Sequence, residues 1–251
     1  MLRHSVLAAV PTMDPRTTPE AVSIQAGAVK LHGLLRLPAD ASSVILFAHG
    51  SGSGRLSPRN NFVAERLWQA GIATLLLDLL TAKEEEVDAV TAELRFDIPL
   101  LTTRLAAATE WALRQQPLRR LAVGYFGAST GAAAALAAAP EMPQVTAVVS
   151  RGGRPDLAGP ALARVRAATL LIVGGNDPQV LALNQEALRE LRCEKELAVV
   201  PGATHLFAEA GALEQVTTLA TAWFTRHARP RGAASPAVSG PERKGLSSAG
   251  S

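Results

Sequence analysis

Short apolar runs alternate along the chain with segments of helical periodicity. Six runs are rich in Val, Ile and Leu, and they span residues 43–49, 72–80, 121–127, 145–150, 168–175 and 196–202. Continuous apolar runs of this length are typical of strands that are buried on both faces of a sheet. The pattern therefore predicts a mostly parallel central sheet.

The segments between these runs carry apolar residues at helical spacing. The clearest sets are Leu101, Leu105, Ala108 and Ala112, and Leu213, Val216, Ala220 and Trp223. Alternation of buried strands with helices is typical of an α/β protein with right-handed crossovers and helices on both faces of the sheet. Residues 22–38 alternate less cleanly and include two glycines, so they predict one or two antiparallel edge strands at the start.

Length and composition favour one large domain. The chain has 251 residues, a mass of 26.2 kDa and 48% hydrophobic residues, which is enough for a sizeable core. We assign this domain to residues 21–228, after a flexible N-terminal segment, 1–20, in which Met13 is an alternative start to Met1. Residues 229–251 are rich in Pro, Gly, Ser and Ala and predict a disordered tail.

Charge, aromatic and cysteine content exclude several classes of protein. A net charge of +3 with 4% aromatic residues is not the pattern of a nucleic-acid-binding face. No apolar run approaches the roughly 20 residues of a membrane span, and the apolar stretch near Met1 is too short for a secretory signal. The single cysteine, Cys193, excludes an internal disulfide and a Cys-based metal site, so we expect a cytoplasmic protein.

A G-x-S-x-G pattern follows the third apolar run. Gly127-Ala128-Ser129-Thr130-Gly131 stands between a predicted strand and an alanine-rich segment. A nucleophile on a sharp strand-to-helix turn needs small neighbours, since its backbone is strained and Cβ atoms on either side would collide. We therefore interpret Ser129 as a nucleophile, with a tight turn that carries no chemistry as the alternative.

A base and an acid follow in the order that such a nucleophile requires. A serine needs a histidine to take its proton, and the histidine needs a carboxylate to fix its tautomer. His205 lies after the last predicted strand, and Asp177 lies just beyond the preceding one. Asp177 also suits a helix cap before Pro178. Asp156, in the loop after an earlier strand, is the reserve acid.

A glycine-rich loop at residues 49–54, "HGSGSG", ends the first predicted parallel strand. Glycines let backbone N–H groups approach a developing negative charge closely. The expected oxyanion donors are the backbone N–H groups of Ser51 and Thr130. The loop lacks the Lys-Ser/Thr ending of a phosphate loop and the spacing of a dinucleotide-binding turn, which argues against nucleotide binding.

Four motifs together carry a family resemblance. The segments "FAHGSGSG", "GYFGASTG", "LLIVGGND" and "PGATHLF" resemble the α/β-hydrolase superfamily and, within it, the small proteins without a lid that are similar to dienelactone hydrolases. The resemblance covers about residues 22–226. It is strongest to a bacterial subgroup whose members sometimes occur fused to phosphoribosyltransferase domains.

The resemblance implies the α/β-hydrolase fold and a mechanism. An acyl-enzyme would form on Ser129, His205 would transfer the proton, and water would hydrolyse the intermediate. Dienelactone hydrolases use a cysteine nucleophile where this chain has Ser129, which argues against dienelactone as the substrate. Only residues 151–167 separate the two strands between which related hydrolases insert a lid, so we expect an open site with no cap domain.

Charged residues near the predicted strand ends are candidates for substrate binding. Arg55, Arg151 and Arg154 lie in such loops beside His49 and Gly50, and an arginine there suits a carboxylate or phosphate on the substrate. The alternative is ordinary exposed arginines. The acidic run 83–88 is interpreted as the solvated start of a helix, with an overhang on the same rim as the alternative.

These observations predict a serine hydrolase that cleaves a small ester, lactone or thioester. The expected partner is a small-molecule ester, with an anionic group as one option; no cofactor, metal, nucleic acid or membrane is expected, and the pattern does not indicate an oligomeric state. An acyl or peptidyl transferase with the same triad, and a non-catalytic binding protein of the same fold, are the alternatives.

Overall fold

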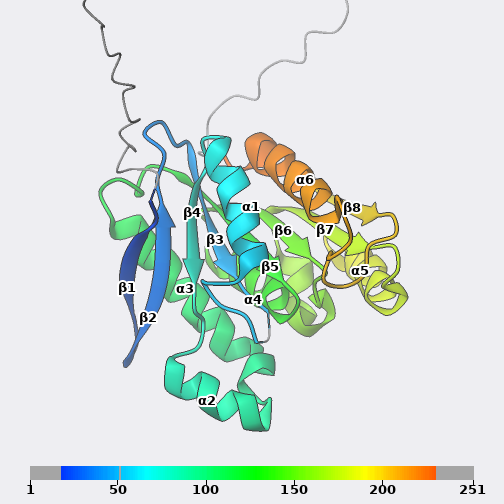
Figure 1. The fold of residues 1–251 in the computed structure, drawn as a ribbon, viewed down its shortest axis with the longest axis horizontal. Helices are drawn as coiled ribbons and strands as arrows, with labels where there is room; N and C mark the ends of the chain where they lie inside the picture. Colours follow the sequence, from blue (N-terminus) through cyan, green and yellow to red (C-terminus); the bar gives the residue numbers. More distant parts are fainter. Residues whose placement is uncertain (1–17, 51, 230–251) are drawn as a thin grey trace, which may run out of the picture.

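Eight strands form one sheet at the centre of the molecule (Figure 1). The structure is a computed structural model, which describes residues 18–50 and 52–229. The strands are β1 (Glu20–Ala26), β2 (Val29–Arg36), β3 (Ser43–Ala48), β4 (Ala73–Leu77), β5 (Ala122–Ala128), β6 (Val145–Arg151), β7 (Ala168–Gly174) and β8 (Lys195–Val200). The predicted segments 1–20 and 229–251 and the alternative start Met13 fall largely outside the described residues, although Glu20 already begins β1.

The strand order is β1-β2-β4-β3-β5-β6-β7-β8. β1 pairs with β2 and β2 with β4 in antiparallel register. The six strands β3 to β8 are parallel to one another. The carboxyl ends of the parallel strands therefore meet at one edge of the sheet, where sites collect in folds of this kind. The predicted mostly parallel sheet with an antiparallel start is confirmed. Of the two antiparallel strands at the start, β1 lies at the edge and β2 lies inside the sheet.

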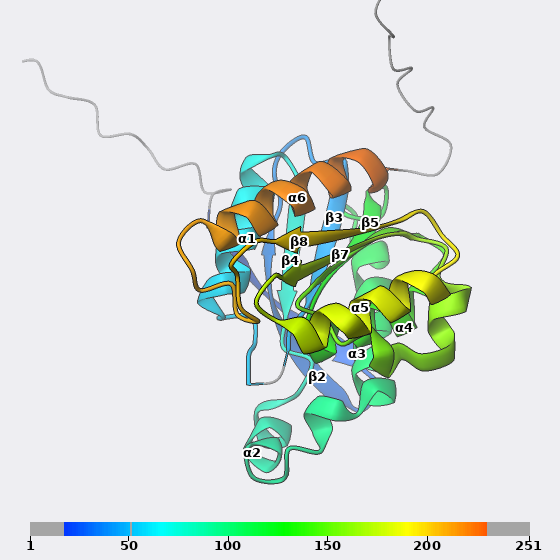
Figure 2. The same ribbon diagram turned by 90° about the vertical axis from the view of Figure 1, so that its right-hand side faces the viewer.

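Helices cover both faces of the sheet, as Figures 1 and 2 show. The α-helices are α1 (Pro58–Gln69), α2 (Ala82–Thr91), α3 (Ile98–Arg114), α4 (Thr130–Ala138), α5 (Pro178–Glu190) and α6 (Ala212–His227), and the 3₁₀ segments are η2 (Leu94–Phe96), η3 (Ala139–Glu141) and η4 (Pro155–Arg164). α1 and α6 pack on one face, and α3, α4 and α5 pack on the other.

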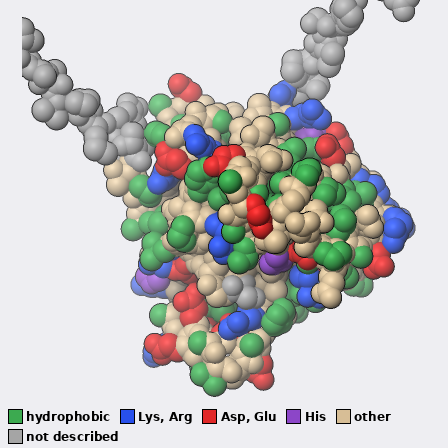
Figure 3. Space-filling model, turned by 45° about the vertical axis from the view of Figure 1, so that its right-hand side comes forward, with side chains coloured by type: hydrophobic (Ala, Val, Ile, Leu, Met, Phe, Trp, Pro, Cys, Tyr) green, Lys and Arg blue, Asp and Glu red, His purple; other side chains and the backbone are tan. Residues whose placement is uncertain are grey.

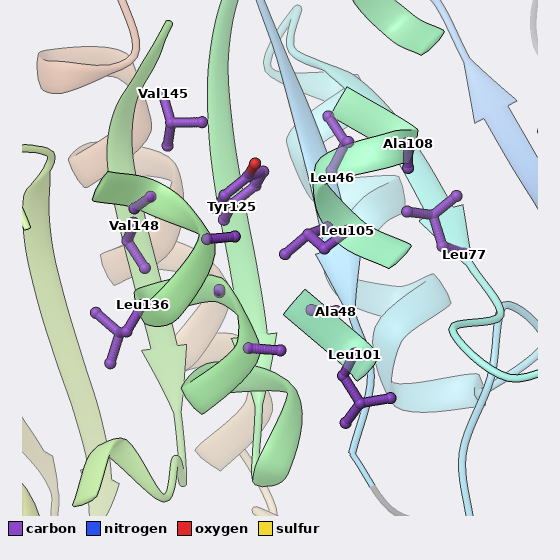
Figure 4. Close-up of a cluster of buried hydrophobic side chains, with 14 of the residues drawn as sticks. Leu46, Ala48, Leu77, Leu101, Leu105, Ala108, Tyr125, Leu136, Val145 and Val148 are labelled. Carbon is purple, nitrogen blue, oxygen red and sulfur yellow. The ribbon is translucent and has the colours of Figure 1, made fainter. Parts of the chain in front are cut away.

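Alternate residues of each parallel strand enter two separate hydrophobic clusters. In β3, Leu46 and Ala48 belong to the cluster beneath α3 and α4, whereas Ile45 and Phe47 belong to the cluster beneath α1 and α6. Figure 4 shows the first cluster, in which strand residues such as Leu46 and Tyr125 face leucines of α3. Burial on both faces explains why the strands have continuous apolar sequences.

The connection between β6 and β7 consists of a short loop and η4, and no cap domain is inserted there. The capping box that Thr81 and Glu84 form begins α2, so the acidic run does start a helix as predicted. α2 projects from the end of the sheet (Figures 1 and 2), held by Glu84–Arg104 and Asp88–Arg95 ion pairs of 2.7 Å each. It therefore stands beside the edge at which the parallel strands end.

Candidate active site

Ser129 occupies a strained turn between β5 and α4. Its φ is 52° and its ψ is −123°, a backbone conformation that residues other than glycine rarely adopt. A Cβ atom at Gly131 would overlap the carbonyl oxygens of Ala48 and His49, and one at Gly127 would overlap Ala132. Both flanking glycines of the G-x-S-x-G pattern thus meet the steric need that the sequence indicated.

The end of β3 packs directly against this turn. A Cβ atom at Gly50 would lie 2.8 Å from the Cβ of Ser129, so only glycine fits there. Thr130 is the first residue of α4 and is buried. Ser51, the other expected oxyanion donor, lies outside the described residues.

Asp177 and His205 form a hydrogen-bonded pair. His205 Nδ1 lies 2.8 Å from Asp177 Oδ2, and their side chains are 40% and 15% exposed. Asp177 Oδ1 also accepts a hydrogen bond of 3.4 Å from the backbone N–H of Val180, which caps α5. The cap that the sequence suggested and the partnership with a base therefore hold together.

The loops that carry the pair are tied to each other. Asn176 donates its backbone N–H to Ala203 O and its side-chain amide to Gly202 O, both at 2.9 Å. Asn176 stands next to Asp177, and Ala203 precedes His205 by two residues. These bonds fix the distance between the two loops, and thus between the acid and the base.

The loop after β6 connects Ser129 with His205. The backbone N–H of Ser129 donates to Arg151 O at 3.3 Å, and that of Arg154 donates to Ser129 O at 3.1 Å. A Cβ atom at Gly152 would lie 3.5 Å from His205 Nδ1. Ser129, Asp177 and His205 therefore gather around one loop at the carboxyl edge of the sheet.

Asn184 supports this loop from α5, a role that sequence reasoning missed. Its side chain is fully buried, and its amide donates to Gly153 O at 3.0 Å and to Val180 O at 2.8 Å. An asparagine inside a helix with otherwise ordinary periodicity was the only available signal. The buried amide anchors the middle of the loop that contacts both Ser129 and His205.

A cavity of about 550 Å³ lies beside the strained turn at residues 127–131, which we call the elbow. Its wall includes His49, Gly50 and Thr130 next to the turn, the start of α1, and Glu85 and Asp88 of α2. The acidic run therefore both begins a helix and overhangs the site, so the interpretation as a merely solvated helix start was incomplete. A volume of this size suits a small organic ligand.

His49 is held by the backbone through both ring nitrogens. Nδ1 lies 3.0 Å from Gly50 O, and Nε2 accepts a hydrogen bond of 2.9 Å from the N–H of Leu79. Burial lowers the pKa of His49, which agrees with a neutral ring protonated at Nδ1. A polar contact from His49 to a substrate would break one of these bonds, so the expected binding role is reduced to the apolar ring surface.

The structure separates the three arginines that the sequence grouped together. Arg55 forms an ion pair with Asp78, and Arg154 forms a bidentate pair with Asp156 at 2.7 and 2.9 Å. Asp156 is thereby paired with Arg154, whereas the carboxylate that bonds to His205 is that of Asp177. Arg151 has no carboxylate partner among the described residues.

The described residues were also searched for metal sites and membrane spans. In residues 18–50 and 52–229, no group of three or more His, Cys, Asp or Glu side chains is placed to hold a metal ion. No helix within these ranges combines the length and apolar character needed to cross a membrane.

The fold and the residues at its carboxyl edge define the class of protein. A mostly parallel eight-stranded sheet, a serine on a strained turn after β5 and an Asp–His pair after β7 and β8 are the features of an α/β-hydrolase. Residues 31–226 match the model of the dienelactone hydrolase family, and the chain belongs to this family.

Comparisons with individual proteins support the same placement. The chain is 57% identical to a dienelactone hydrolase from Anabaena variabilis of known structure, with a TM-score of 0.82 over 84% of this chain and 98% of that one. Est1E from Butyrivibrio proteoclasticus shares the fold at 16% identity, with a TM-score of 0.68 over 82% of this chain and 97% of that one.

Two curated relatives are about twice as long as the part that they share with this chain. Proteins of two Mycobacterium tuberculosis strains, each called a putative phosphoribosyl transferase, are 54% identical over 215 residues, which is 85% of this chain and 48% of theirs. The chain therefore spans about half the length of these relatives.

Proposed function

We propose that this member of the dienelactone hydrolase family is a serine hydrolase that cleaves a small ester, lactone or thioester. The observation that carries the proposal is the Asp177–His205 hydrogen bond of 2.8 Å, at the sheet edge where Ser129 stands on its strained turn. The carboxylate holds the imidazole with Nδ1 protonated, which leaves Nε2 as the base.

In the first half of the reaction, Ser129 Oγ attacks the substrate carbonyl while His205 Nε2 takes its proton. The resulting oxyanion is stabilised by backbone N–H groups, for which we propose Thr130 at the N-terminus of α4 and Ser51. His205 then gives its proton to the departing alkoxide or thiolate, which becomes the alcohol or thiol, and an acyl-enzyme remains on Ser129.

In the second half, His205 takes a proton from a water molecule, which attacks the acyl carbonyl. Collapse of the second tetrahedral intermediate returns the proton to Ser129 Oγ and releases the acid. The short connection between β6 and β7 leaves the site open to small acyl groups. An acyl transferase would use the same residues with another acceptor in place of water.

The first test is the loss of Ser129. Wild-type protein is expected to react with a fluorophosphonate probe and to hydrolyse p-nitrophenyl acetate, whereas Ser129→Ala should lose probe labelling and roughly 10³-fold or more of kcat. Ser42→Ala is the matched control and should retain both. It removes an exposed serine just before β3, whose other end lies against the elbow.

Labelling of the Ser129→Ala protein, or equal turnover by both proteins, would contradict the assignment. Release of free acid in water, measured with and without added alcohols and amines, separates a hydrolase from an acyl transferase. A folded wild-type protein that neither labels nor turns over any activated ester would favour the non-catalytic alternative.

A further inference from the structure

Two arginines at the edge of the site lack the carboxylate partners that their neighbours have. Arg55 and Arg154 are neutralised by Asp78 and Asp156. Among the described residues, neither Arg59 nor Arg151 forms an ion pair, and Arg59 Nε and Arg151 Nη1 are buried without any hydrogen-bond partner.

Arg151 is the more unusual of the two because it is buried. The residue is only 9% exposed. Its Cζ lies 6.0 Å from the centroid of the Phe126 ring, and its Nη2 donates a hydrogen bond of 3.4 Å to Asn60 Oδ1. Burial and the neighbouring charge of Arg59 lower the pKa of Arg151 to about 10, so it is still protonated at neutral pH. A buried cation with an unused donor is costly unless an anion pairs with it.

The N-terminus of α1 adds positive potential at the same place. Arg59 and Asn60 belong to the first turn of this 12-residue helix, and that first turn contains no acidic residue. Backbone N–H groups at a helix N-terminus favour anions. Asn60, which holds the Arg151 guanidinium, therefore joins two sources of positive potential.

This positive corner borders the cavity beside the elbow. Arg59 and Thr130 both line the cavity, and Arg151, the last residue of β6, pairs with Ala128 of β5, the residue before Ser129. Three acids lie in the same wall. Asp78 pairs with Arg55 and Asp88 pairs with Arg95, whereas burial raises the pKa of the third acid, Glu85. On the face in Figure 3, basic and acidic side chains are interspersed.

We propose that Arg59, Asn60 and Arg151 form a subsite for a phosphate group on the ester substrate, an inference that rests on the hydrolase function proposed above. Two unpaired guanidinium groups beside a helix N-terminus match a dianion better than a monocarboxylate, since a single negative charge would leave one cation buried and unpaired. The phosphate serves as a handle that places the ester carbonyl near Ser129 and is not itself cleaved.

The first arm of the test measures binding without catalysis. Inorganic phosphate is titrated into the Ser129→Ala protein by calorimetry, and saturable binding is expected. Adding Arg151→Gln or Arg59→Gln to Ser129→Ala should weaken that binding by roughly 10- to 100-fold, the effect of one charge-assisted hydrogen-bond partner. Arg114→Gln, which removes an exposed arginine of α3, is the charge-matched control and should not change it.

The second arm compares three p-nitrophenyl esters of matched length, which carry a terminal phosphonate, a carboxylate or a methyl group. The phosphonate ester should have the highest kcat/KM, and Arg59→Gln and Arg151→Gln should lower it by roughly tenfold or more through KM, with little effect on the methyl ester. Arg151→Lys, which keeps the charge, should restore part of the loss.

Specific outcomes would overturn the subsite. The subsite is excluded if the Ser129→Ala protein does not bind phosphate, or if Arg59→Gln and Arg151→Gln leave its affinity for phosphate unchanged. Either result would count even if Ser129 proves catalytic. A preference for the carboxylate ester excludes phosphate as the group bound. Failure of the proposed hydrolase function would appear instead as unchanged turnover by Ser129→Ala. Circular dichroism and the Arg59→Gln variant guard against the case in which Arg151→Gln alone fails to fold.

Discussion

At the scale of single residues, the serine at the elbow shows how the site is made at the expense of local stability. Ser129 has a positive φ, and Gly50, Gly127 and Gly131 leave no room for a Cβ atom, because the end of β3, the turn and the start of α4 approach closely. Non-glycine residues in such backbone regions cost on the order of 1–3 kcal/mol, which the surrounding packing must offset.

This strain predicts opposite consequences for two substitutions that both remove the proposed nucleophile. Ser129→Gly relieves the unfavourable φ, whereas Ser129→Ala retains it. We expect the free energy of unfolding of Ser129→Gly to exceed that of Ser129→Ala by about 1 kcal/mol, the net of relieved strain and the greater chain entropy of glycine. Urea unfolding of the two proteins measures the difference, and a glycine variant that is less stable than the alanine variant would refute the strain.

At the scale of elements, the site depends on a loop that a neighbouring helix supports. The segment after β6 hydrogen-bonds to Ser129 and contacts His205, and Asn184 of α5 holds its middle through Gly153 O. Asn184 is therefore a positioning residue: it touches neither the nucleophile nor the base, and it acts on both through the loop.

Replacement of Asn184 by alanine should loosen that loop. The Gly153 carbonyl loses its donor, so we expect roughly a tenfold decrease in kcat with a smaller change in KM, and a stability loss of about 1–2 kcal/mol. Gln185→Ala, at the exposed neighbouring position, is the control. If kcat is unchanged while stability falls, Asn184 is a purely structural residue.

Much of this arrangement was visible in the sequence, and the missing parts share one physical cause. The parallel strands and the glycines beside Ser129 are local patterns, each set by a few adjacent residues, and Ser129, Asp177 and His205 each follow such a strand. Ion pairing is not local: Arg55 meets Asp78 23 residues away, and Arg151 meets Asn60 91 residues away. Sequence alone therefore grouped paired and unpaired arginines together.

At the scale of the whole molecule, two hydrophobic clusters on opposite faces of one sheet make a single cooperative body. Gly124 of β5 shows how closely the cluster beneath α1 and α6 packs on the sheet, because a Cβ atom there would lie 2.7 Å from Ile45 Cδ1 and 3.0 Å from the Phe224 ring. The buried His49 is tied into this body by hydrogen bonds to Gly50 and Leu79. Its protonation is thus linked to the stability of the entire domain.

The stability of the domain should decrease in mild acid. Burial lowers the pKa of His49 below 6.5 in the folded chain, while the unfolded chain keeps the ordinary value. Between these two pKa values the unfolded state binds more protons, so the free energy of unfolding falls as pH falls below 6.5, by up to about 1.4 kcal/mol per pH unit for one proton. Urea unfolding at several pH values measures this slope.

The variant His49→Gln isolates this contribution. Its stability should depend less on pH in the same range, although its stability at neutral pH is expected to be lower because the bonds to the ring are lost. Burial also lowers the pKa of His227, which contributes to the pH dependence of both proteins alike. Identical slopes for wild type and His49→Gln would exclude His49 as the cause.

The two hydrogen bonds of Asp177 link local folding to the catalysis that we propose. One carboxylate oxygen accepts a bond from the first turn of α5 and the other bonds to His205, so we expect the carboxylate to face the proposed base only while that turn is formed. Amide exchange at Val180 would then report how often the catalytic pair is assembled. A ligand or partner that protects the Val180 amide from exchange is therefore expected to keep His205 in the orientation that the proposed reaction needs.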